Sequence, residues 1–338
     1  MNALAAERFR KFKQNRLGVV SSITFTVLFF LSLFAEFLAN DKPLVLSYNG
    51  RLHVSVFVDY PETYFGGQFE TRADYRDPYV ADLIEEDGWM LWPPVRFSHS
   101  TINYDLKSPA PSPPSRENLL GTDDKGRDVL ARVIYGFRVS VLFGLILTLI
   151  SSIIGVCVGA AMGYYGGRLD IIGQRFLEIW GSLPTLFILI ILSNVIQPNF
   201  FWLLGILLLF SWMGFVGVVR AEFLRTRNFE YVLAAKAMGL PDRLIIFRHV
   251  LPNAMVATLT FMPFTLSGAI TSLTALDFLG FGLPPGSPSL GELLAQAKAN
   301  LHAPWLAFSS FGVLALILAL LVFSGEAVRD AFDPRKAV

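Results

Sequence analysis

Long apolar runs separated by shorter polar segments form the dominant pattern along this chain. A hydrocarbon core about 30 Å thick requires roughly 20 apolar residues in each helix that crosses it. Runs of this length predict six membrane-spanning helices, near residues 18–39, 139–164, 177–197, 200–220, 254–277 and 305–324. The expected fold class is therefore an all-α polytopic membrane protein.

The longest polar segment, residues 40–138, follows the first predicted span. Alternating apolar and polar side chains over residues 52–58 predict a half-buried strand. Asp77 supplies a helix N-cap, Pro78 suits the first helical position and Gly88 supplies a stop, so a short helix is expected there. The segment is therefore expected to fold as a small α/β insertion.

Lysine and arginine accumulate in the N-terminal arm, in the C-terminal tail and between the fourth and fifth spans. Short cytoplasmic segments carry such positive charge, so both termini are expected in the cytoplasm and the insertion outside it. Arg127, Arg132 and Arg138 fall on the opposite side, after a long translocated segment, where the charge rule weakens. The expected divisions are an arm with the first span (1–39), the extracytoplasmic insertion and connector (40–138), a core with five spans (139–324) that includes a cytoplasmic coupling loop (221–253), and a cytoplasmic tail (325–338).

Composition limits the chemistry that the chain can perform. Hydrophobic residues make up 53% of the 338 residues, and the net charge of +1 leaves no concentrated basic face for nucleic acid. The single cysteine, Cys157, excludes an intramolecular disulfide, and the four histidines lack metal-ligand spacing. Glycines at 121 and 126 mimic a phosphate-binding loop, but Arg127 and Asp128 replace its Lys-Ser/Thr pair. No catalytic residue, metal site or nucleotide site is expected, so an energy source would lie on another chain.

The segment between the fourth and fifth spans contains the most informative local signals. Asn228 can cap a helix that ends at Gly239, because glycine accepts the left-handed conformation and Pro241 discourages continuation. Asp242 can cap a second helix that runs to Leu251. Alanines leave the first helix with a low profile that a partner protein can approach. The residues alone favour either a docking site or an ordinary amphipathic loop.

This segment resembles the EAA loop of ABC importer permeases, with matches at Ala234, Ala235, Gly239, Leu251 and Pro252. Two positions differ from the family pattern, since Leu233 replaces its glutamate and His249 replaces its isoleucine. Four further stretches resemble the C-type permeases of dipeptide and oligopeptide importers: residues 120–128, 163–168, 278–285 and 330–335. The long extracytoplasmic segment is similar to that of Yej-type peptide permeases, a branch that admits microcin C.

The resemblance implies a type I ABC importer permease fold in the bacterial inner membrane. It implies a heterodimer with a second permease subunit, two cytoplasmic ABC ATPase domains that hold ATP and Mg, and a periplasmic peptide-binding protein. The chain itself would bind no cofactor and would translocate a peptide substrate by alternating access. A secondary peptide transporter and a membrane scaffold protein remain the alternatives, and co-purification of an ATPase would separate them from an ABC permease.

Two further sets of residues are candidates for contact with cargo and with the delivery protein. Hydroxyl side chains in the fifth span predict part of a peptide pathway, although such residues also favour helix packing; they are Thr265, Ser267, Thr271 and Ser272. The connection before the sixth span holds an extended, pre-ordered segment on the outer side, and its expected contacts with the binding protein are Pro284, Pro285, Gly286 and Ser287. The alternative is that this connection only joins two spans.

Overall fold

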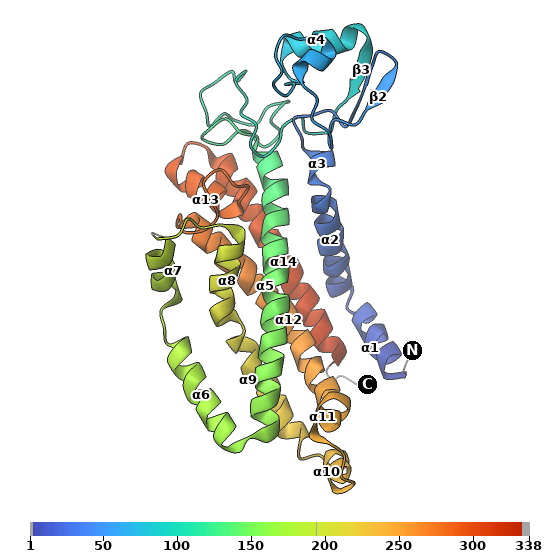
Figure 1. The fold of residues 1–338 in the computed structure, drawn as a ribbon, viewed down its shortest axis with the longest axis vertical. Helices are drawn as coiled ribbons and strands as arrows, with labels where there is room; N and C mark the ends of the chain where they lie inside the picture. The colour runs from blue at the N-terminus through green and yellow to red at the C-terminus, as the bar shows by residue number, and fades with distance from the viewer. Residues whose placement is uncertain (1–2, 194, 333–338) are drawn as a thin grey trace.

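A computed structural model describes residues 3–193 and 195–332 as a helical bundle with a small insertion at one end (Figure 1). Among these residues, five helical segments are long and apolar enough to cross a membrane. They are α2 (Arg16–Leu33), α5 (Val129–Tyr165), α8 with α9 (Phe200–Ser211 and Met213–Thr226), the segment from Asp242 to α12 (Leu251–Phe278), and α14 (Pro304–Phe332). The mostly helical architecture confirms the predicted fold class.

The third predicted span differs from the prediction because it is not one straight helix. It consists of α6 (Gly167–Gly181) and α7 (Thr185–Ser193), which are bent by 58° relative to each other. Pro184 lies in the break, where its ring and missing N–H prevent the helix from continuing. The number of spans is six when this bent pair is counted as one.

Helix α5 runs through the centre of the bundle and starts ten residues before the predicted span. Its early start follows from Asp128, whose carboxylate accepts the Ala131 N–H at 2.7 Å and caps the first turn. Three glycines, Gly155, Gly159 and Gly163, form one face that packs directly against α9. A Cβ atom added at any of them would lie within 3.0 Å of α9 atoms, so these glycines allow the close approach of the two helices.

The insertion contains a three-stranded antiparallel sheet in the order β2-β1-β3. Its elements are β1 (Val45–Tyr48), β2 (Arg51–His53), the short helix η1 (Glu62–Phe65), α4 (Pro78–Glu86) and β3 (Gly88–Leu91). The side chains of Leu46, Phe65 and Ile84 are fully buried in its core. Asp77 caps α4 through the Tyr79 N–H, as predicted.

The predicted strand over residues 52–58 is wrong beyond His53. The N–H groups of Phe57 and Val58 both donate to the Val54 carbonyl at 3.3 Å, which closes a turn instead of a ladder. Ser55 points inward and donates its hydroxyl to the Pro43 carbonyl. The alternating pattern of apolar and polar residues therefore predicted too long a strand. The inward-facing Ser55 bonds to the Pro43 carbonyl and not to a neighbouring strand.

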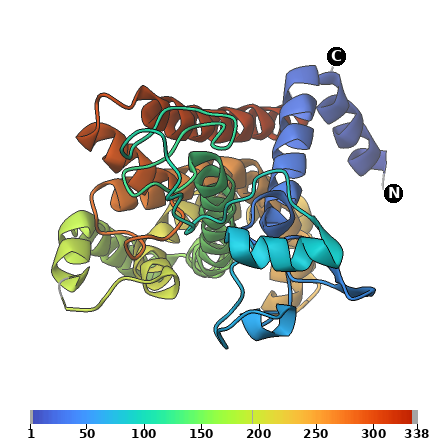
Figure 2. The same ribbon diagram turned by 90° about the horizontal axis from the view of Figure 1, so that it is seen from above.

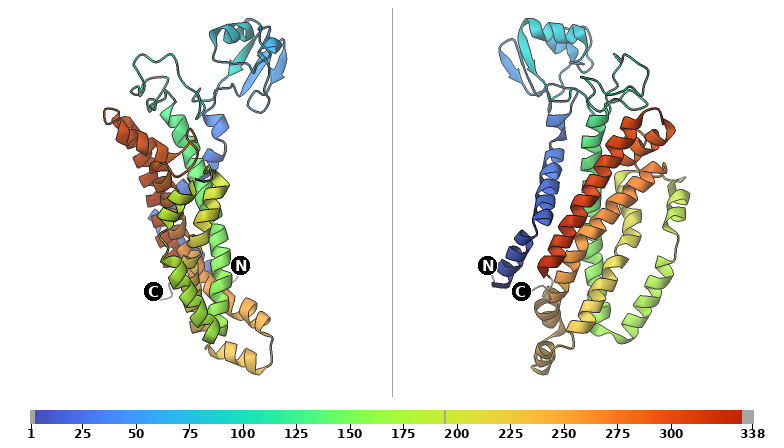
Figure 3. Two further views of the ribbon diagram at one scale, coloured as in Figure 1. Left: turned by 60° about the vertical axis from the view of Figure 1, so that its left-hand side comes forward. Right: turned by 180° about the vertical axis from the view of Figure 1, so that it is seen from behind.

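Different elements lie at the two ends of the bundle (Figures 1 and 3). The insertion covers one end, together with α3 (Ala35–Leu38) and α13 (Leu290–Ala299). Helices α10 (Glu230–Ala237) and α11 (Asp242–Ile245) project from the other end, toward which α1 (Ala3–Gln14) and the end of α14 also point. The predicted tail starts at 325, but α14 continues to Phe332, and residues 333–338 lie outside the described residues.

Candidate functional site

The predicted docking segment forms two short helices, α10 and α11, joined by a sharp turn, and this pair is named the docking helices after its predicted role. Gly239 has a φ of +77°, the left-handed conformation expected of a glycine after a helix. The Gly239 N–H donates to the Lys236 carbonyl at 2.9 Å, and the Leu240 N–H donates to the Ala235 carbonyl at 3.2 Å. These two bonds satisfy the last carbonyls of α10 and fix the angle between the docking helices.

Both predicted N-caps of the docking helices are wrong in detail. The Asn228 side chain donates to the Leu224 carbonyl, while Phe229 occupies the cap position of α10 without a side-chain bond. Asp242 is the first residue of α11, and its carboxylate accepts the Tyr164 hydroxyl at 2.6 Å. Asp242 therefore links the docking helices to the end of α5 instead of capping its own helix.

The predicted docking residues divide into buried and exposed groups. Ala235 is buried between the docking helices, against Val232 and Ile245. Ala234 and Gly239 are exposed. The most exposed large apolar side chains of the docking segment are those of Met238, Phe247 and Leu233. Of these, only Leu233 stands out in the sequence, as a departure from the family pattern.

The second docking helix continues into the fifth span without a break. Residues 246–250 form one wide helical turn, η2, between α11 and α12, so a single helical segment extends from Asp242 to Phe278. Leu251 and Pro252 lie in the first turn of α12. Pro252 has no N–H to donate to the preceding turn, and the wider turn before it accommodates the lost hydrogen bond. A displacement of the docking helices would therefore act directly on α12.

The end of α5 also contacts the docking helices. The Lys236 ammonium lies 4.7 Å from the centre of the Tyr164 ring, and the Tyr164 hydroxyl binds Asp242. The Arg227 guanidinium donates to the Gly163 and Tyr164 carbonyls at 3.2 Å. The Arg227 bonds satisfy carbonyls at the end of α5, and the contacts of Tyr164 with Lys236 and Asp242 hold the docking helices against it.

The hydroxyl residues of α12 lie on two adjoining faces. Thr265 and Ser272 line a cavity of about 420 Å³ between α12, α5, α8 and α9, together with Gly268. Ser267 and Thr271 do not line this cavity, and their hydroxyls donate to the carbonyls four residues earlier in the helix. Thr271 and Ser272 are exposed, so this part of α12 lacks a covering element among the described residues of the chain.

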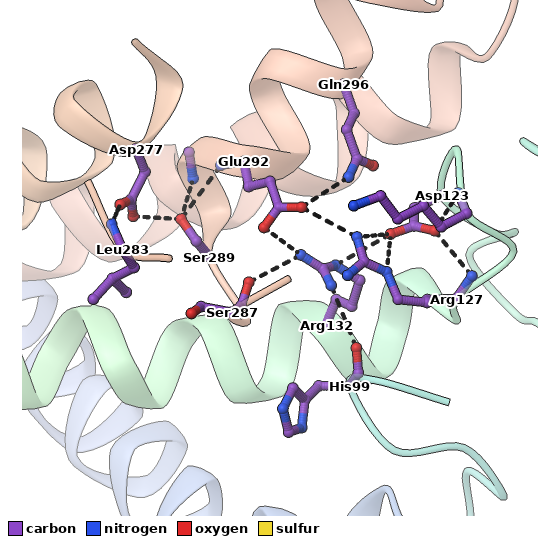
Figure 4. Close-up of polar contacts among 12 residues, drawn as sticks. His99, Asp123, Arg127, Arg132, Asp277, Leu283, Ser287, Ser289, Glu292 and Gln296 are labelled. Carbon is purple, nitrogen blue, oxygen red and sulfur yellow. Dashed lines mark hydrogen bonds and ion pairs between the residues drawn. The ribbon is translucent and has the colours of Figure 1, made fainter. Parts of the chain in front are cut away.

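The connection between α12 and α13 is fixed by buried polar groups (Figure 4). Asp277 accepts the Leu283 N–H at 2.7 Å and also accepts the hydroxyl of Ser289, which caps α13. Arg132 of α5 donates to the Ser287 carbonyl at 3.0 Å. Among the predicted contact residues, Pro284 and Pro285 are exposed, Gly286 and Ser287 are half-buried, and Gly286 has a φ of +94°.

A buried network of two arginines and two acids joins this connection to the start of α5. Arg127 donates to Asp123 at 2.7 Å and to Glu292 at 3.1 Å. Arg132 pairs with Glu292 at 3.0 Å and with Asp123 at 3.4 Å. Asp123 and Arg132 are completely buried, so each depends on these opposite charges.

These pairs account for the arginines that violate the charge rule. Arg127 and Arg132 belong to the network, while Arg138 forms a two-bond ion pair with Glu36 of α3 at 2.9 Å. All three arginines are neutralised by carboxylates and hold the insertion end together. Their positive charge therefore carries no information on which side of the membrane they lie.

The end of the bundle that holds the insertion, named the outer end after the side predicted for it, also contains a cavity of about 460 Å³, between the insertion and the segment that leads from it to α5. Tyr75, Met90 and Trp92 line it from the insertion, and arginine and carboxylate side chains line it from both parts. No ion pair joins Arg96 or Arg116 to a carboxylate of the described residues. The cavity therefore presents charges of both signs to a partner.

The described residues form a bundle of candidate membrane spans, with two short helices projecting at one end and small and hydroxyl residues on an uncovered part of α12. A family described as "Binding-protein-dependent transport system inner membrane component" matches residues 155–338. A second, "N-terminal TM domain of oligopeptide transport permease C", matches residues 4–51. The chain therefore belongs to the family of inner-membrane components of binding-protein-dependent transport systems, whose permeases have no catalytic site of their own.

Similar proteins narrow the class further. The chain is 60% identical to the inner membrane ABC transporter permease protein YejE of Escherichia coli, over 98% of this chain and 97% of that protein. It is 56% identical to the peptidoglycan transport system permease protein YejE of Agrobacterium fabrum, over 97% and 92%. The oligopeptide transport system permease protein OppC of Haemophilus influenzae is 35% identical, over 71% and 77%. This chain is thus a multi-pass inner-membrane permease subunit of a binding-protein-dependent ABC importer.

Proposed function

We propose that this subunit carries peptides into the cytoplasm, driven by ATP that partner ATPases hydrolyse. The observation that carries the proposal is the uninterrupted helical segment from Asp242 to Phe278, which joins the docking helices to the hydroxyl face of α12. Relatives named for oligopeptide and dipeptide transport support a peptide cargo. Microcin C-like peptides are included in this proposal, on the resemblance to Yej-type permeases.

The docking helices would receive one of two ATPase domains, and ATP and Mg would bind there rather than to this chain. Met238 is 73% exposed at the tip, beside the exposed Ala234 and Gly239. Together they offer a small apolar surface on a turn of fixed geometry, which loses little conformational freedom on binding. Ala235 supports this surface from beneath, because its methyl group packs inside the docking helices.

The exposed face of α12 would meet the second permease subunit, and the peptide would pass between the two. Thr271 and Ser272 present hydroxyls there, and Gly268 leaves room for a passing chain. Closure of the ATPases would pull the docking helices, and α12 would tilt with them. Alternating access requires that nucleotide bind one of the two conformations more tightly than the other.

The opposite end would receive the peptide-loaded binding protein, with the termini of this subunit in the cytoplasm. Pro284 and Pro285 are exposed on a connection that Arg132 and Asp277 hold in place. The charged cavity between the insertion and its connector offers a second contact surface. Both surfaces lie at the end of the bundle away from the docking helices.

Peptide uptake by the complete complex in proteoliposomes tests the proposal. Uptake should require ATP and should be lost when the ATPases are inactivated. Ala234→Glu should lower ATP-driven uptake without reducing membrane insertion of this subunit, because it places a charge on the exposed docking surface and leaves the buried packing intact. Uptake that persists with inactive ATPases and stops when the proton gradient collapses would identify a secondary transporter instead.

Cysteine labelling tests the pathway separately. In a Cys157→Ser background, Thr271→Cys should react with a water-soluble thiol reagent in at least one nucleotide state, and Ser267→Cys should react more slowly because Ser267 is half-buried. Protection of both positions in every state would assign this face to helix packing.

A further inference from the structure

The turn that follows β2 displays apolar side chains that the insertion core does not use. Phe57 is 73% exposed and Leu52 is 70% exposed, with Val54 and Val58 beside them. A small sheet domain normally turns such side chains inward, because each loses favourable burial when it faces water. The turn therefore indicates a contact outside the insertion.

The turn is held by its own bonds, so the exposed side chains are presented at a fixed position. Ser55 is completely buried, and its hydroxyl donates to the Pro43 carbonyl at 2.6 Å. Asp59 follows the turn directly. Its carboxylate pairs with Lys42 and also with Arg72, whose Nε lies 3.1 Å from Asp59 Oδ1. The turn cannot rotate its apolar side chains into the insertion core without breaking these contacts.

The apolar surface continues from the first span. The Phe57 ring lies 5.8 Å from the ring of Phe37 in α3, and Phe37 lies 6.2 Å from Phe34, the residue that joins α2 to α3. Phe34 in turn extends the exposed apolar stripe of α2 that includes Val27 and Phe30. Phe57 is thus the last member of a row of apolar side chains that begins on α2, a candidate membrane span.

The position of the insertion relative to α2 and α3 can be followed in the ribbon views of Figures 1 and 3. The insertion sits directly above α3, and its hairpin lies toward the side of the bundle formed by α2 (Figures 1 and 3). Seen from above, the blue hairpin projects beyond the spanning helices (Figure 2). Because Phe57 contacts α3, the turn after β2 lies at the end of α2 that meets the insertion.

We propose that residues 52–58 form a membrane anchor whose apolar side chains enter the interfacial region of the outer leaflet. Aromatic and large aliphatic side chains at the headgroup boundary are favoured there, where apolar area leaves water without crossing the bilayer. The anchor sets the height and tilt of the insertion above the bilayer. It thereby fixes the outer cavity and the α12–α13 connection relative to an arriving soluble partner.

Site-directed spin labelling of the full-length chain, within its complex in lipid nanodiscs, tests this anchor. The label is placed by Phe57→Cys in a Cys157→Ser background and compared with Phe69→Cys. Phe69 is the matched control because it is 62% exposed in the same insertion, while its carbonyl accepts the Thr63 N–H of η1, a helix that packs against α4. Accessibility is measured to oxygen, which concentrates in lipid, and to a water-soluble nickel complex.

The label at 57 should show higher oxygen accessibility and several-fold lower nickel accessibility than the label at 69. Equal nickel accessibility at both positions would overturn the proposal, because the turn would then face water. Protection of position 57 from both reagents would also overturn it, since a protein partner rather than lipid would cover the turn. Phe57→Asp should keep the complex assembled but abolish protection of a neighbouring label at Leu52→Cys.

Discussion

The docking end and the outer end of this permease are stabilised by different interactions. At the docking end, small and apolar residues such as Gly163 and Ala235 allow close packing, and α11 continues into α12. At the outer end, the buried charges of Asp123, Arg132 and Glu292 lock α5 to α13. A buried ion network has strict geometry, whereas close-packed helices can shift as bodies. We therefore expect the docking end to transmit movement and the outer end to act as a fixed platform.

Removal of Arg132 should cause the largest loss of stability, because it disrupts the charge network of the outer end. Arg132→Ala leaves Asp123 and Glu292 with only Arg127 for two carboxylates, and loss of one partner from a buried pair costs about 3–5 kcal/mol. Thermal unfolding of the purified subunit should shift strongly downward. Arg175→Ala is the control, because Arg175 is exposed and pairs with exposed Glu178, so its loss should cost under about 1 kcal/mol. Equal shifts in both variants would show that the network does not hold the outer end.

Substitutions at two adjacent alanines of α10 should distinguish residues that stabilise the docking helices from residues that contact the ATPase. Ala235→Glu buries a carboxylate without a partner, which we expect to cost about 3 kcal/mol and to lower both stability and transport. Ala234→Glu places the same charge on the exposed face, so it should leave the unfolding midpoint unchanged and lower only ATP-coupled transport. Midpoints and uptake are measured for both variants. If Ala235→Glu spared stability, the docking helices would not be packed as described.

Substitution of a glycine on the α5 face that packs against α9 should lower the stability moderately. A Cβ atom added at Gly159 would lie 2.9 Å from the Val216 carbonyl oxygen, which belongs to backbone and cannot move aside easily. Gly159→Ala should therefore cost about 1–3 kcal/mol through overpacking. Gly205→Ala in α8 meets nothing within 4 Å and should be neutral or slightly stabilising. Unfolding midpoints measure both, and a neutral Gly159→Ala would mean that α5 and α9 can separate.

Acidification from neutral pH should have the smallest effect, through His99 at the outer end. Burial and the nearby charges of Arg132 and Arg138 lower the pKa of His99 below its ordinary value of 6.5. The unfolded chain then binds this proton more readily than the folded chain. The contribution of His99 to stability is complete above pH 6.5 and decreases as the pH falls below it. His99→Gln should flatten the dependence of the unfolding midpoint on pH in that range, and an unchanged slope would contradict the assignment.

Local signals in the sequence predicted the docking turn and the short helix of the insertion. Gly239 and Asp77 act within their own turns, so their roles follow from neighbouring residues. The outer network could not be predicted, because Arg132 and Glu292 are 160 residues apart and a single sequence gives no sign of their contact. The search for long apolar runs also placed the start of α5 too late, because the first turns of this helix contain buried charged residues.

Other features had signals that the apolar pattern concealed. Pro184 marks the break in the third span, but the surrounding residues are apolar enough to suggest one helix. The repeat of Gly155, Gly159 and Gly163 at every fourth position indicates a close helix contact. For the candidate site, the sequence located the docking helices but not the burial of Ala235, which depends on packing between the two helices.

A photo-crosslinking amino acid at Met238 tests most directly whether the docking helices receive the ATPase. The reagent is introduced at Met238 and, as the matched position on the other end, at Phe69, in the intact complex in native membranes. Met238 is exposed at the docking tip, so it should capture an ATPase subunit, whereas Phe69 should capture none. An assembled complex in which Met238 captures no ATPase, or in which Phe69 captures one, would contradict the account.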